Sequence, residues 1–225
     1  MPSGALQLIV YDFDGLIIDT ESAILGAWQD AYDHSDRPFP HDTFQEMIGR
    51  ADHPFDPWDD LLANGNAFAS RDELDARFNR INESLIERSP VLPGVIERLF
   101  EARARGIPAA VASSSSHSWV DRHLENRELT RHFDLILCRD DVKHAKPWPD
   151  LYLSVLDHFG VSAANAVAFE DSLNGMTAAK AAGMTCVVIP NATTTTHDFS
   201  AADRVIASLE DIDLDGVEEM LRGRE

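Results

Sequence analysis

Short apolar runs alternate with amphipathic stretches along most of this 225-residue chain. The first run, Leu6–Tyr11, is continuous and short, which is typical of a strand buried on both faces of a sheet. Beyond about residue 94, four similar runs and one shorter segment predict further strands at Pro108–Ala112, Asp134–Cys138, Ala166–Phe169, Thr185–Ile189 and near Val205.

Helix-periodic segments separate these strands. The expected helices are Val95–Arg105, Ser116–Glu128, Asp150–Phe159, Ser172–Ala182 and a last one from about Ser208. Gly106 and Gly183 follow two of them, as glycine does at many helix ends. Strands that alternate with helices of about ten residues predict right-handed βαβ units. The chain is therefore expected to form an α/β fold with a Rossmann-like parallel sheet covered by helices on both faces.

Residues 18–88 have a different pattern of residue types. They are polar and helix-periodic, several prolines interrupt them, and they contain no strand pattern. Two capping boxes predict helix starts there, Thr43 with Glu46 and Ser70 with Glu73. A stretch this long is too large for a loop of a compact domain. We interpret it as an inserted domain of three or four helices, with residues 1–17 and 89–225 forming the α/β domain.

The charge balance limits the classes of binding partner. The chain has 39 acidic and 19 basic residues, a net charge of −20, and 44% apolar residues. This excess of negative charge argues against nucleic acid and anionic membranes, which both need a basic footprint. No apolar run reaches the ~18 residues of a membrane span, and the amino terminus lacks the features of a secretion signal. The two cysteines, Cys138 and Cys186, lie in apolar runs and suggest no disulfide framework. We expect a cytoplasmic protein, either a monomer or a weak homodimer.

The end of the first strand carries two carboxylates, Asp12 and Asp14, in the sequence Asp-Phe-Asp-Gly. Ligands of open α/β sheets bind at the carboxyl ends of strands. Two acids there are costly unless a cation neutralises them. With a metal, one carboxylate could bind the ion and attack while the other moves a proton. The same four residues would also suit a turn or a helix cap, so this segment alone leaves both interpretations open.

Three other strand ends carry polar residues. Ser113–Ser116 follow one strand, where a hydroxyl and backbone N–H groups at a helix start could bind an anion or simply cap the helix. Lys146 precedes a proline-rich turn and could present a positive charge to phosphate, although most lysines are solvated. Glu170 and Asp171 end a very apolar strand and, with Asp12, would supply the oxygen ligands that magnesium prefers. Together these parts are those that stabilise a transferring phosphoryl group.

Four segments then give a family resemblance. They are Asp12–Glu21, the strand end at Ser113, Lys146–Tyr152 and Glu170–Gly175. In order and spacing they resemble the four motifs of the haloacid dehalogenase-like (HAD) superfamily, in the branch that holds β-phosphoglucomutase and sugar-phosphate phosphatases. The resemblance covers essentially the whole chain. It implies a HAD-like core in which residues 18–88 form the helical cap domain.

The resemblance also implies roles. Asp12 would form an aspartyl-phosphate and Asp14 would be the general acid and base. Magnesium, the implied cofactor, would be held by Asp12, by the backbone carbonyl of Asp14 and by Asp171, with Glu170 close by. The phosphate would be held by Ser113, the Ser114 N–H and Lys146. Thr20 and Asn174 match family positions near the site.

These motifs leave the type of reaction open. We expect a magnesium-dependent phosphatase that hydrolyses a small phosphorylated metabolite, with a sugar phosphate as the favoured class. The alternatives are a β-phosphoglucomutase-type mutase and a non-catalytic phosphate-binding regulatory protein. Ile24 stands where mutases of the branch carry a cap histidine, which favours the phosphatase. Arg50 and His53 are candidate substrate contacts of the cap, although exposed or helix-ending side chains would explain both.

Overall fold

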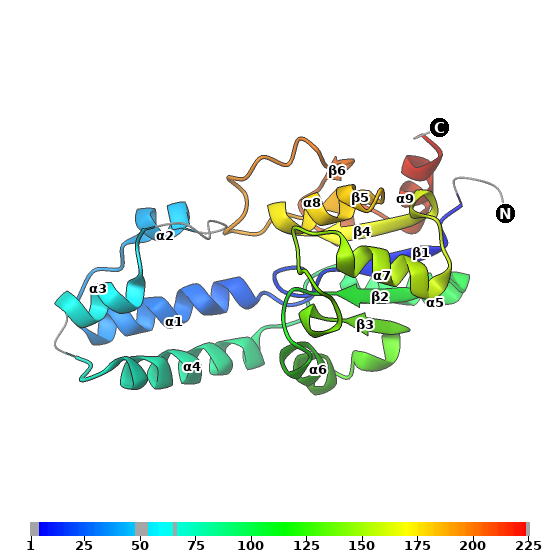
Figure 1. Cartoon of the computed structure of the whole chain (residues 1–225). Coiled ribbons are helices and arrows are strands. Elements are labelled where there is room, and N and C mark those ends of the chain that lie inside the picture. The colour runs from blue at the N-terminus through cyan, green and yellow to red at the C-terminus, as the bar shows by residue number, and fades with distance from the viewer. Residues whose placement is uncertain (1–4, 48–53, 65–66, 224–225) are drawn as a thin grey trace. The chain divides into compact units, whose positions relative to one another are not determined.

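The computed structural model describes residues 5–47, 54–64 and 67–223 (Figure 1). The chain divides into two compact units, Met1–Ile18 with Val91–Glu225, and Asp19–Pro90. Ile18 belongs to the first unit because it forms an isolated bridge with Val91. The neighbouring Ile17 carbonyl also accepts a hydrogen bond from Leu92 N–H at 2.9 Å. These boundaries differ from the division drawn from the sequence by one residue at the first crossing and two at the second.

The first unit contains a six-stranded, all-parallel sheet with the strand order β3-β2-β1-β4-β5-β6. Its strands are β1 (Leu8–Tyr11), β2 (Ala109–Ala112), β3 (Leu135–Leu137), β4 (Ala166–Glu170), β5 (Thr185–Val188) and β6 (Arg204–Val205). The predicted Rossmann-like α/β fold is confirmed. Most strands are one or two residues shorter than predicted, because apolar residues also continue into the turns beside them.

Helices connect the strands as expected. They are α5 (Val95–Arg105), α6 (His117–Asn126), α7 (Asp150–Phe159), α8 (Leu173–Ala181) and α9 (Leu214–Arg222). Four short 3-10 turns lie between elements, η1 (Thr130–His132), η2 (Arg139–Asp141), η3 (Ala163–Asn165) and η4 (Leu209–Asp211). The bounds of α5 agree with the prediction because Gly106 ends the helix in a left-handed conformation (φ +67°).

The two faces of β1 are covered by different layers. Leu8 and Val10 belong to an apolar cluster that includes residues of α7 and α8. Because side chains alternate along a strand, Ile9 and Tyr11 point to the opposite face. There Tyr11 lies against the rings of Phe133 and Phe169. All four residues of β1 are fully buried, so the residues that follow β1 begin in the core of the first unit.

Both cysteines are buried within this core. Cys186 belongs to the cluster under α7 and α8, and Cys138 follows β3. Both are free thiols, as the sequence predicts. Burial raises the pKa of Cys138 to about 12 and raises that of Cys186 still further above its usual value.

The carboxyl-terminal helix begins later than predicted. The Ser208 side chain accepts the Glu210 N–H at 3.1 Å, which starts the short turn η4 instead of a helix. Asp213 then caps α9 by accepting the Gly216 N–H at 2.8 Å. The prediction of a helix from about Ser208 was therefore wrong, because two capping residues in succession divide this segment into two elements.

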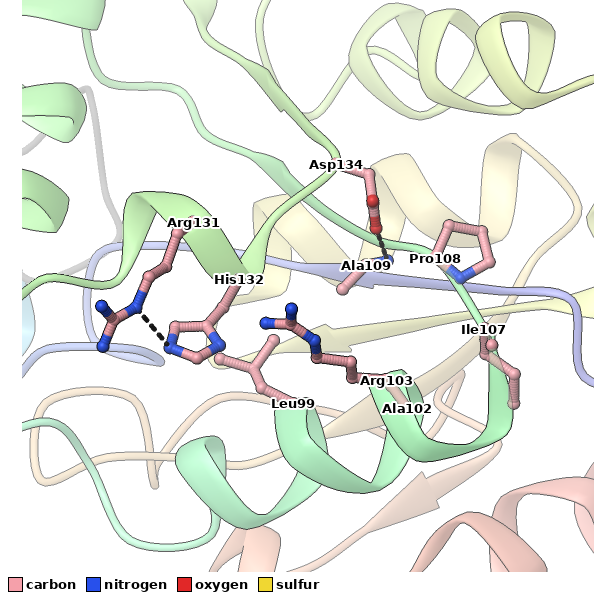
Figure 2. Close-up of a pocket in the computed structure, with 10 residues that line it drawn as sticks. Leu99, Ala102, Arg103, Ile107, Pro108, Ala109, Arg131, His132 and Asp134 are labelled. Atoms are coloured by element: carbon pink, nitrogen blue, oxygen red, sulfur yellow. Dashed lines mark hydrogen bonds between the residues drawn. The ribbon is translucent and has the colours of Figure 1, made fainter.

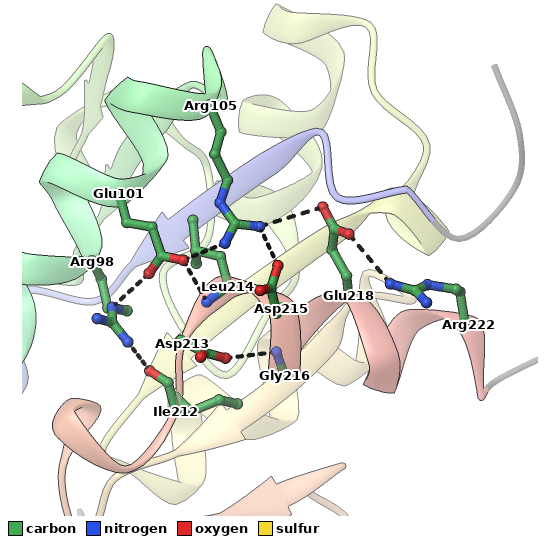
Figure 3. A network of polar contacts seen from close by, with 10 residues as sticks. All are labelled: Arg98, Glu101, Arg105, Ile212, Asp213, Leu214, Asp215, Gly216, Glu218 and Arg222. Atoms are coloured by element: carbon green, nitrogen blue, oxygen red, sulfur yellow. Dashed lines mark hydrogen bonds and ion pairs between the residues drawn. The ribbon is translucent and has the colours of Figure 1, made fainter.

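An ion-pair network joins α9 to α5 (Figure 3). Glu101 lies at its centre, 3.2 Å from Arg98 Nε and 2.5 Å from an Arg105 nitrogen. It also accepts the Leu214 N–H at 3.2 Å, at the start of α9. Arg105 in turn reaches Asp215 at 2.8 Å. The half-buried Glu101 carboxylate therefore fixes α9 to α5.

All regular secondary structure in the described residues of the second unit is helical. Its helices are α1 (Thr20–His34), α2 (His41–Met47), α3 (Pro57–Asn64) and α4 (Arg71–Arg88). Trp28 and Phe44 lie in its apolar core. Ser70 caps α4 as predicted. Thr43 does not start a helix, because Pro40 O already accepts the Phe44 N–H at 3.1 Å and the helix has begun before it.

No helix in the described part of the chain is both long enough and apolar enough to cross a lipid bilayer.

Replacement of Glu101 by glutamine tests the α5–α9 network. The amide keeps the shape but loses the charge that faces Arg98 and Arg105. We expect Glu101→Gln to lower the free energy of unfolding by about 1–3 kcal/mol, as measured by urea denaturation. The exposed Glu219 on α9 is the matched control, and Glu219→Gln should change stability by less than about 0.5 kcal/mol. Equal effects of the two substitutions would contradict a specific role for Glu101.

Candidate active site

The carboxyl ends of β1 and β4 bring three acidic residues together. Asp12 follows β1, Glu170 ends β4, and Asp171 comes next. Each offers a carboxylate oxygen within 4.8 Å of the others, and all three residues are buried. The order of the sheet reverses between these two neighbouring strands, because β2 and β3 lie on one side of β1 and β4 to β6 on the other. Such a reversal is where open α/β sheets bind ligands.

Lys146 connects two of these carboxylates. Its Nζ atom lies 2.5 Å from Asp12 Oδ1 and 2.6 Å from Glu170 Oε1, and only 4% of its side chain is exposed. Glu170 Oε1 also accepts a hydrogen bond from the Tyr152 hydroxyl of α7. The loop before α7 therefore supplies a buried cation, and α7 supplies a buried donor, to the acids that end β1 and β4.

The charges of this cluster do not balance. Three carboxylates face one ammonium group within the described residues of the cluster. Burial raises the pKa of Asp12 to about 7; the charge of Lys146 opposes this effect, and the charge of Glu170 adds to it. Burial alone would lower the pKa of Lys146, but Asp12 and Glu170 raise it, so the ammonium form persists. A further cation would stabilise Asp12 in its ionised form.

Asp14 has a different environment from Asp12. Its Oδ2 accepts a hydrogen bond from Ser115 Oγ at 2.6 Å, and its Oδ1 accepts one from Trp119 Nε1 at 2.9 Å. Ser115 belongs to the segment that links β2 to α6, and Trp119 lies in the first turn of α6. Asp14 is half-buried and has neutral donors, whereas Asp12 is buried beside a lysine. The two carboxylates of the Asp-Phe-Asp-Gly sequence are therefore held separately and in chemically distinct surroundings.

Asp171 is fixed by the loop after β5. Asn191 Nδ2 donates to Asp171 Oδ2 at 2.7 Å, and Asn191 Oδ1 accepts from Thr193 N–H at 2.9 Å. Gly15 also faces this carboxylate. A Cβ atom there would lie 2.2 Å from Asp171 Oδ2, and the backbone has a left-handed φ of +75°. Only glycine meets both conditions without displacing the acid.

The predicted phosphate-binding residues lie in different settings. Ser113 follows β2, is buried, and accepts the Ser115 N–H at 3.0 Å. Tyr11 pairs with Val111 in the sheet, so Ser113 and Asp12 follow the carboxyl ends of two paired strands. The neighbouring Ser114 is exposed.

The remaining predicted residues are Asn174, Thr20, Arg50 and His53. Asn174 lies exposed in the first turn of α8, and the side chain that contacts Asp171 is Asn191. Thr20 is the first residue of α1 in the helical unit, and it is buried. Arg50 and His53 lie outside the described residues.

Sequence reasoning missed Ser115, Trp119, Tyr152 and Asn191. Ser115 belongs to the run Ser113–Ser116, and only the first two residues of that run were predicted to bind phosphate. Asn191 comes three residues after β5, so the strand-end rule that selected Glu170 could have selected it. Trp119 and Tyr152 face inward from helices, and a helical aromatic residue carries no pattern that separates a hydrogen-bond donor from ordinary core.

Comparison with known proteins agrees with this geometry. The family model described as haloacid dehalogenase-like hydrolase matches residues 9–189. YhcW of Bacillus subtilis, provisionally named a phosphatase, is 35% identical over 209 residues, which cover 93% of this chain and 94% of that protein. A phosphorylated carbohydrates phosphatase of Thermotoga maritima is 28% identical over 80% of this chain and 82% of its own length.

A solved structure gives the same relationship in three dimensions. CbbY of Rhodobacter sphaeroides, determined in complex with phosphate, superimposes with a TM-score of 0.73 at 27% sequence identity. The match covers 95% of this chain and 99% of that one. The fold, the acidic cluster at the β1–β4 switch point and these similarities lead to one conclusion. The chain belongs to the haloacid dehalogenase-like hydrolase family, in its β-phosphoglucomutase and sugar-phosphate phosphatase-like branch.

Proposed function

We propose that this protein is a magnesium-dependent phosphatase that hydrolyses a small phosphorylated metabolite through an aspartyl-phosphate on Asp12. The enzyme is a phosphoric monoester hydrolase; the metal, the residue roles and the substrate class are the proposal. Its main support is the buried contact of Lys146 with Asp12 and Glu170 at the β1–β4 switch point. The helical unit, Asp19–Pro90, is proposed as the cap domain that selects the substrate.

The different surroundings of Asp12 and Asp14 support their different roles. Asp12 is buried beside the Lys146 ammonium, which holds the carboxylate in one orientation. Asp14 is half-buried and accepts hydrogen bonds from two neutral donors, Ser115 and Trp119, rather than from a buried ammonium group. Two carboxylates with separate environments can divide nucleophilic and acid–base work between them.

The proposed reaction has two steps. A carboxylate oxygen of Asp12 attacks phosphorus, the bond from phosphorus to the ester oxygen breaks, and Asp14 gives its proton to the leaving alcohol. Asp14, now ionised, then takes a proton from a water molecule that attacks the phosphorus of the aspartyl-phosphate. The bond between phosphorus and the Asp12 oxygen breaks, inorganic phosphate leaves, and Asp12 is again a free carboxylate while Asp14 again carries a proton.

The phosphoryl group carries negative charge that the protein must offset. Lys146 supplies one fixed positive charge at the attacking residue. Ser113 and the N–H of the exposed residue Ser114 follow the carboxyl end of β2, beside that of β1, and are proposed to bind phosphoryl oxygens. Hydrogen bonds of this kind strengthen as charge develops on the transferring group.

The acidic cluster fits a magnesium ion. Its three buried carboxylates offer hard oxygen ligands within 4.8 Å of one another, and Lys146 alone does not neutralise them. Magnesium prefers oxygen ligands of this type. We propose Asp12, the Asp14 carbonyl and Asp171 as ligands, with Glu170 close by. When bound, the ion would offset charge on the phosphoryl oxygens.

A sugar phosphate is the proposed substrate class. The phosphorylated carbohydrates phosphatase and CbbY are both similar to this chain over most of its length. Ile24 lies on α1, 39% exposed, at the position where a mutase of this branch would carry a histidine. An isoleucine has no proton to exchange with a sugar hydroxyl, which favours water as the acceptor of the phosphoryl group.

Replacement of Asp12 by asparagine tests the nucleophile. The amide fills the same space but is a poor nucleophile, so turnover should fall by more than about a thousandfold while the circular dichroism spectrum is retained. Asp157 is exposed on α7, and Asp157→Asn should keep wild-type turnover. Acid-quenched wild-type enzyme with substrate should carry a phosphoryl group that mass spectrometry locates on Asp12. A wild-type rate for Asp12→Asn would refute the assignment.

Removal of divalent metal tests the cofactor. A chelator should stop phosphate release, and added magnesium should restore it. Magnesium should also stabilise the wild-type fold by about 3 kcal/mol at about a hundred times its dissociation constant, and this stabilisation should be lost in Asp171→Asn. Full activity in the chelator, or equal stabilisation of both proteins, would contradict the magnesium proposal.

A panel of phosphorylated metabolites tests the substrate class and separates hydrolysis from transfer. Each compound is scored for released inorganic phosphate, and β-glucose 1-phosphate is scored separately for conversion to the 6-phosphate. We expect phosphate release to be largest for a sugar phosphate. Conversion of β-glucose 1-phosphate without net release would show a mutase instead, and inertness of the whole panel with magnesium present would favour a non-catalytic protein.

A further inference from the structure

The loop after β5 places Asn191 beside the acidic cluster. Asn191 Nδ2 donates a hydrogen bond to Asp171 Oδ2 at 2.7 Å. A Cβ atom on Gly15 would lie 2.6 Å from the same Nδ2 atom and 2.2 Å from Asp171 Oδ2, so the turn after β1 packs directly against both groups. Asn191 therefore connects the carboxyl ends of β1, β4 and β5 at the proposed magnesium site.

Two buried threonines determine how the Asn191 amide is turned. Its Oδ1 atom accepts the Thr193 N–H at 2.9 Å, the Thr193 hydroxyl at 2.6 Å and the Thr194 hydroxyl at 3.3 Å. A backbone N–H can only donate, so the amide oxygen must face Thr193 and the NH₂ group must face Asp171. The Thr194 hydroxyl also accepts the Asn191 N–H at 3.0 Å. The loop thus holds the oxygen of the amide and directs its nitrogen at the acid.

A turn alone would need only half of this side chain. An asparagine that closes a turn accepts the N–H of the residue two positions on with its side-chain oxygen, and Thr193 supplies that N–H. The NH₂ group takes no part in such a turn. Its donation to the buried Asp171 carboxylate is an additional contact that the turn does not require.

Asp171 is held differently from other acids at the ends of the strands. Lys146 pairs with the other two acids of the cluster. At the amino ends of the strands, Asp134 Oδ2 accepts the Ala109 backbone N–H at 3.0 Å, so that acid joins the start of β3 to the start of β2 (Figure 2). The amide of Asn191 is a neutral side-chain donor. It fixes the direction of a carboxylate, favours its ionised form and leaves its charge to attract a cation.

We propose that Asn191 is a positioning residue for magnesium, which holds the Asp171 carboxylate in the orientation that binds the ion, and that Thr193 in turn orients Asn191. This inference rests on the proposed magnesium site. Magnesium requires near-ideal octahedral geometry, whereas calcium accepts irregular arrangements of oxygen ligands. Loss of Asn191 should therefore weaken magnesium binding more than calcium binding.

Calorimetric titration of the metal-free, full-length protein with magnesium chloride, and separately with calcium chloride, tests the proposal at fixed ionic strength. Asp171→Asn defines the binding that does not involve the site. We expect Asn191→Ala to raise the magnesium dissociation constant by about 10- to 100-fold and the calcium dissociation constant by only about threefold. Asn126 is exposed on α6, and Asn126→Ala is the matched control that should change neither constant.

A second substitution acts one contact further from the metal. Thr193→Val keeps the backbone N–H and nearly the same shape but removes the hydroxyl that donates to Asn191 Oδ1. It should raise the magnesium dissociation constant by about three- to tenfold, the effect of one hydrogen bond. Thr196→Val makes the same change at an exposed position of the same loop and should have no effect. This pair decides the question if circular dichroism shows that Asn191→Ala does not fold.

The outcomes separate this inference from the metal site itself. Wild-type magnesium affinity in Asn191→Ala and Thr193→Val, or an equal loss of magnesium and calcium affinity, would overturn the positioning role alone. Absence of magnesium binding to the wild-type protein would refute the proposed metal site, and the role of Asn191 with it.

Discussion

The buried contact of Lys146 with Asp12 and Glu170 is the interaction on which the arrangement of the site depends. Removing a charge from water is costly, and removing one partner of such a group leaves the others uncompensated. Three separate parts of the chain must therefore remain in register: the end of β1, the loop before α7 and the end of β4. Gly175 shows how closely they fit, because a Cβ atom there would lie 1.8 Å from Glu170 Oε2.

Strand pairing in the sheet provides this register. β1 is fully buried between β2 and β4, and its pairing sets Tyr11 opposite Phe169. The Asp12 N–H then donates to the Phe169 carbonyl at 2.9 Å, which extends the strand pairing into the site. Beyond this point the chain leaves the strand and turns at Gly15, and Asp14 accepts hydrogen bonds from Ser115, after β2, and from Trp119 of α6. Neighbouring carboxylates thereby acquire separate surroundings, because the backbone brings them to different side-chain partners.

The sequence predicted the fold and the acidic cluster because both follow from local patterns. Buried parallel strands are continuous apolar runs, and ligand-binding residues follow them, so Asp12, Glu170 and Asp171 stand at predictable places. Trp119, Tyr152 and Asn191 could not be selected in this way, because their roles come from distances between segments that are far apart in the chain. The late start of α9 was missed because Ser208 and Asp213 both resemble helix caps. In the folded protein, Glu101 accepts the Leu214 N–H at the start of α9.

The burial of both thiols has a practical consequence. Thiolates are the nucleophilic form of cysteine, and burial keeps Cys138 and Cys186 protonated and covered in the native protein. A maleimide or disulfide-forming reagent would therefore modify a newly introduced surface cysteine in preference to either native one. Pairs of fluorophores or spin labels can be placed on the wild-type background without first deleting its cysteines, so that distances between introduced sites can be measured in solution.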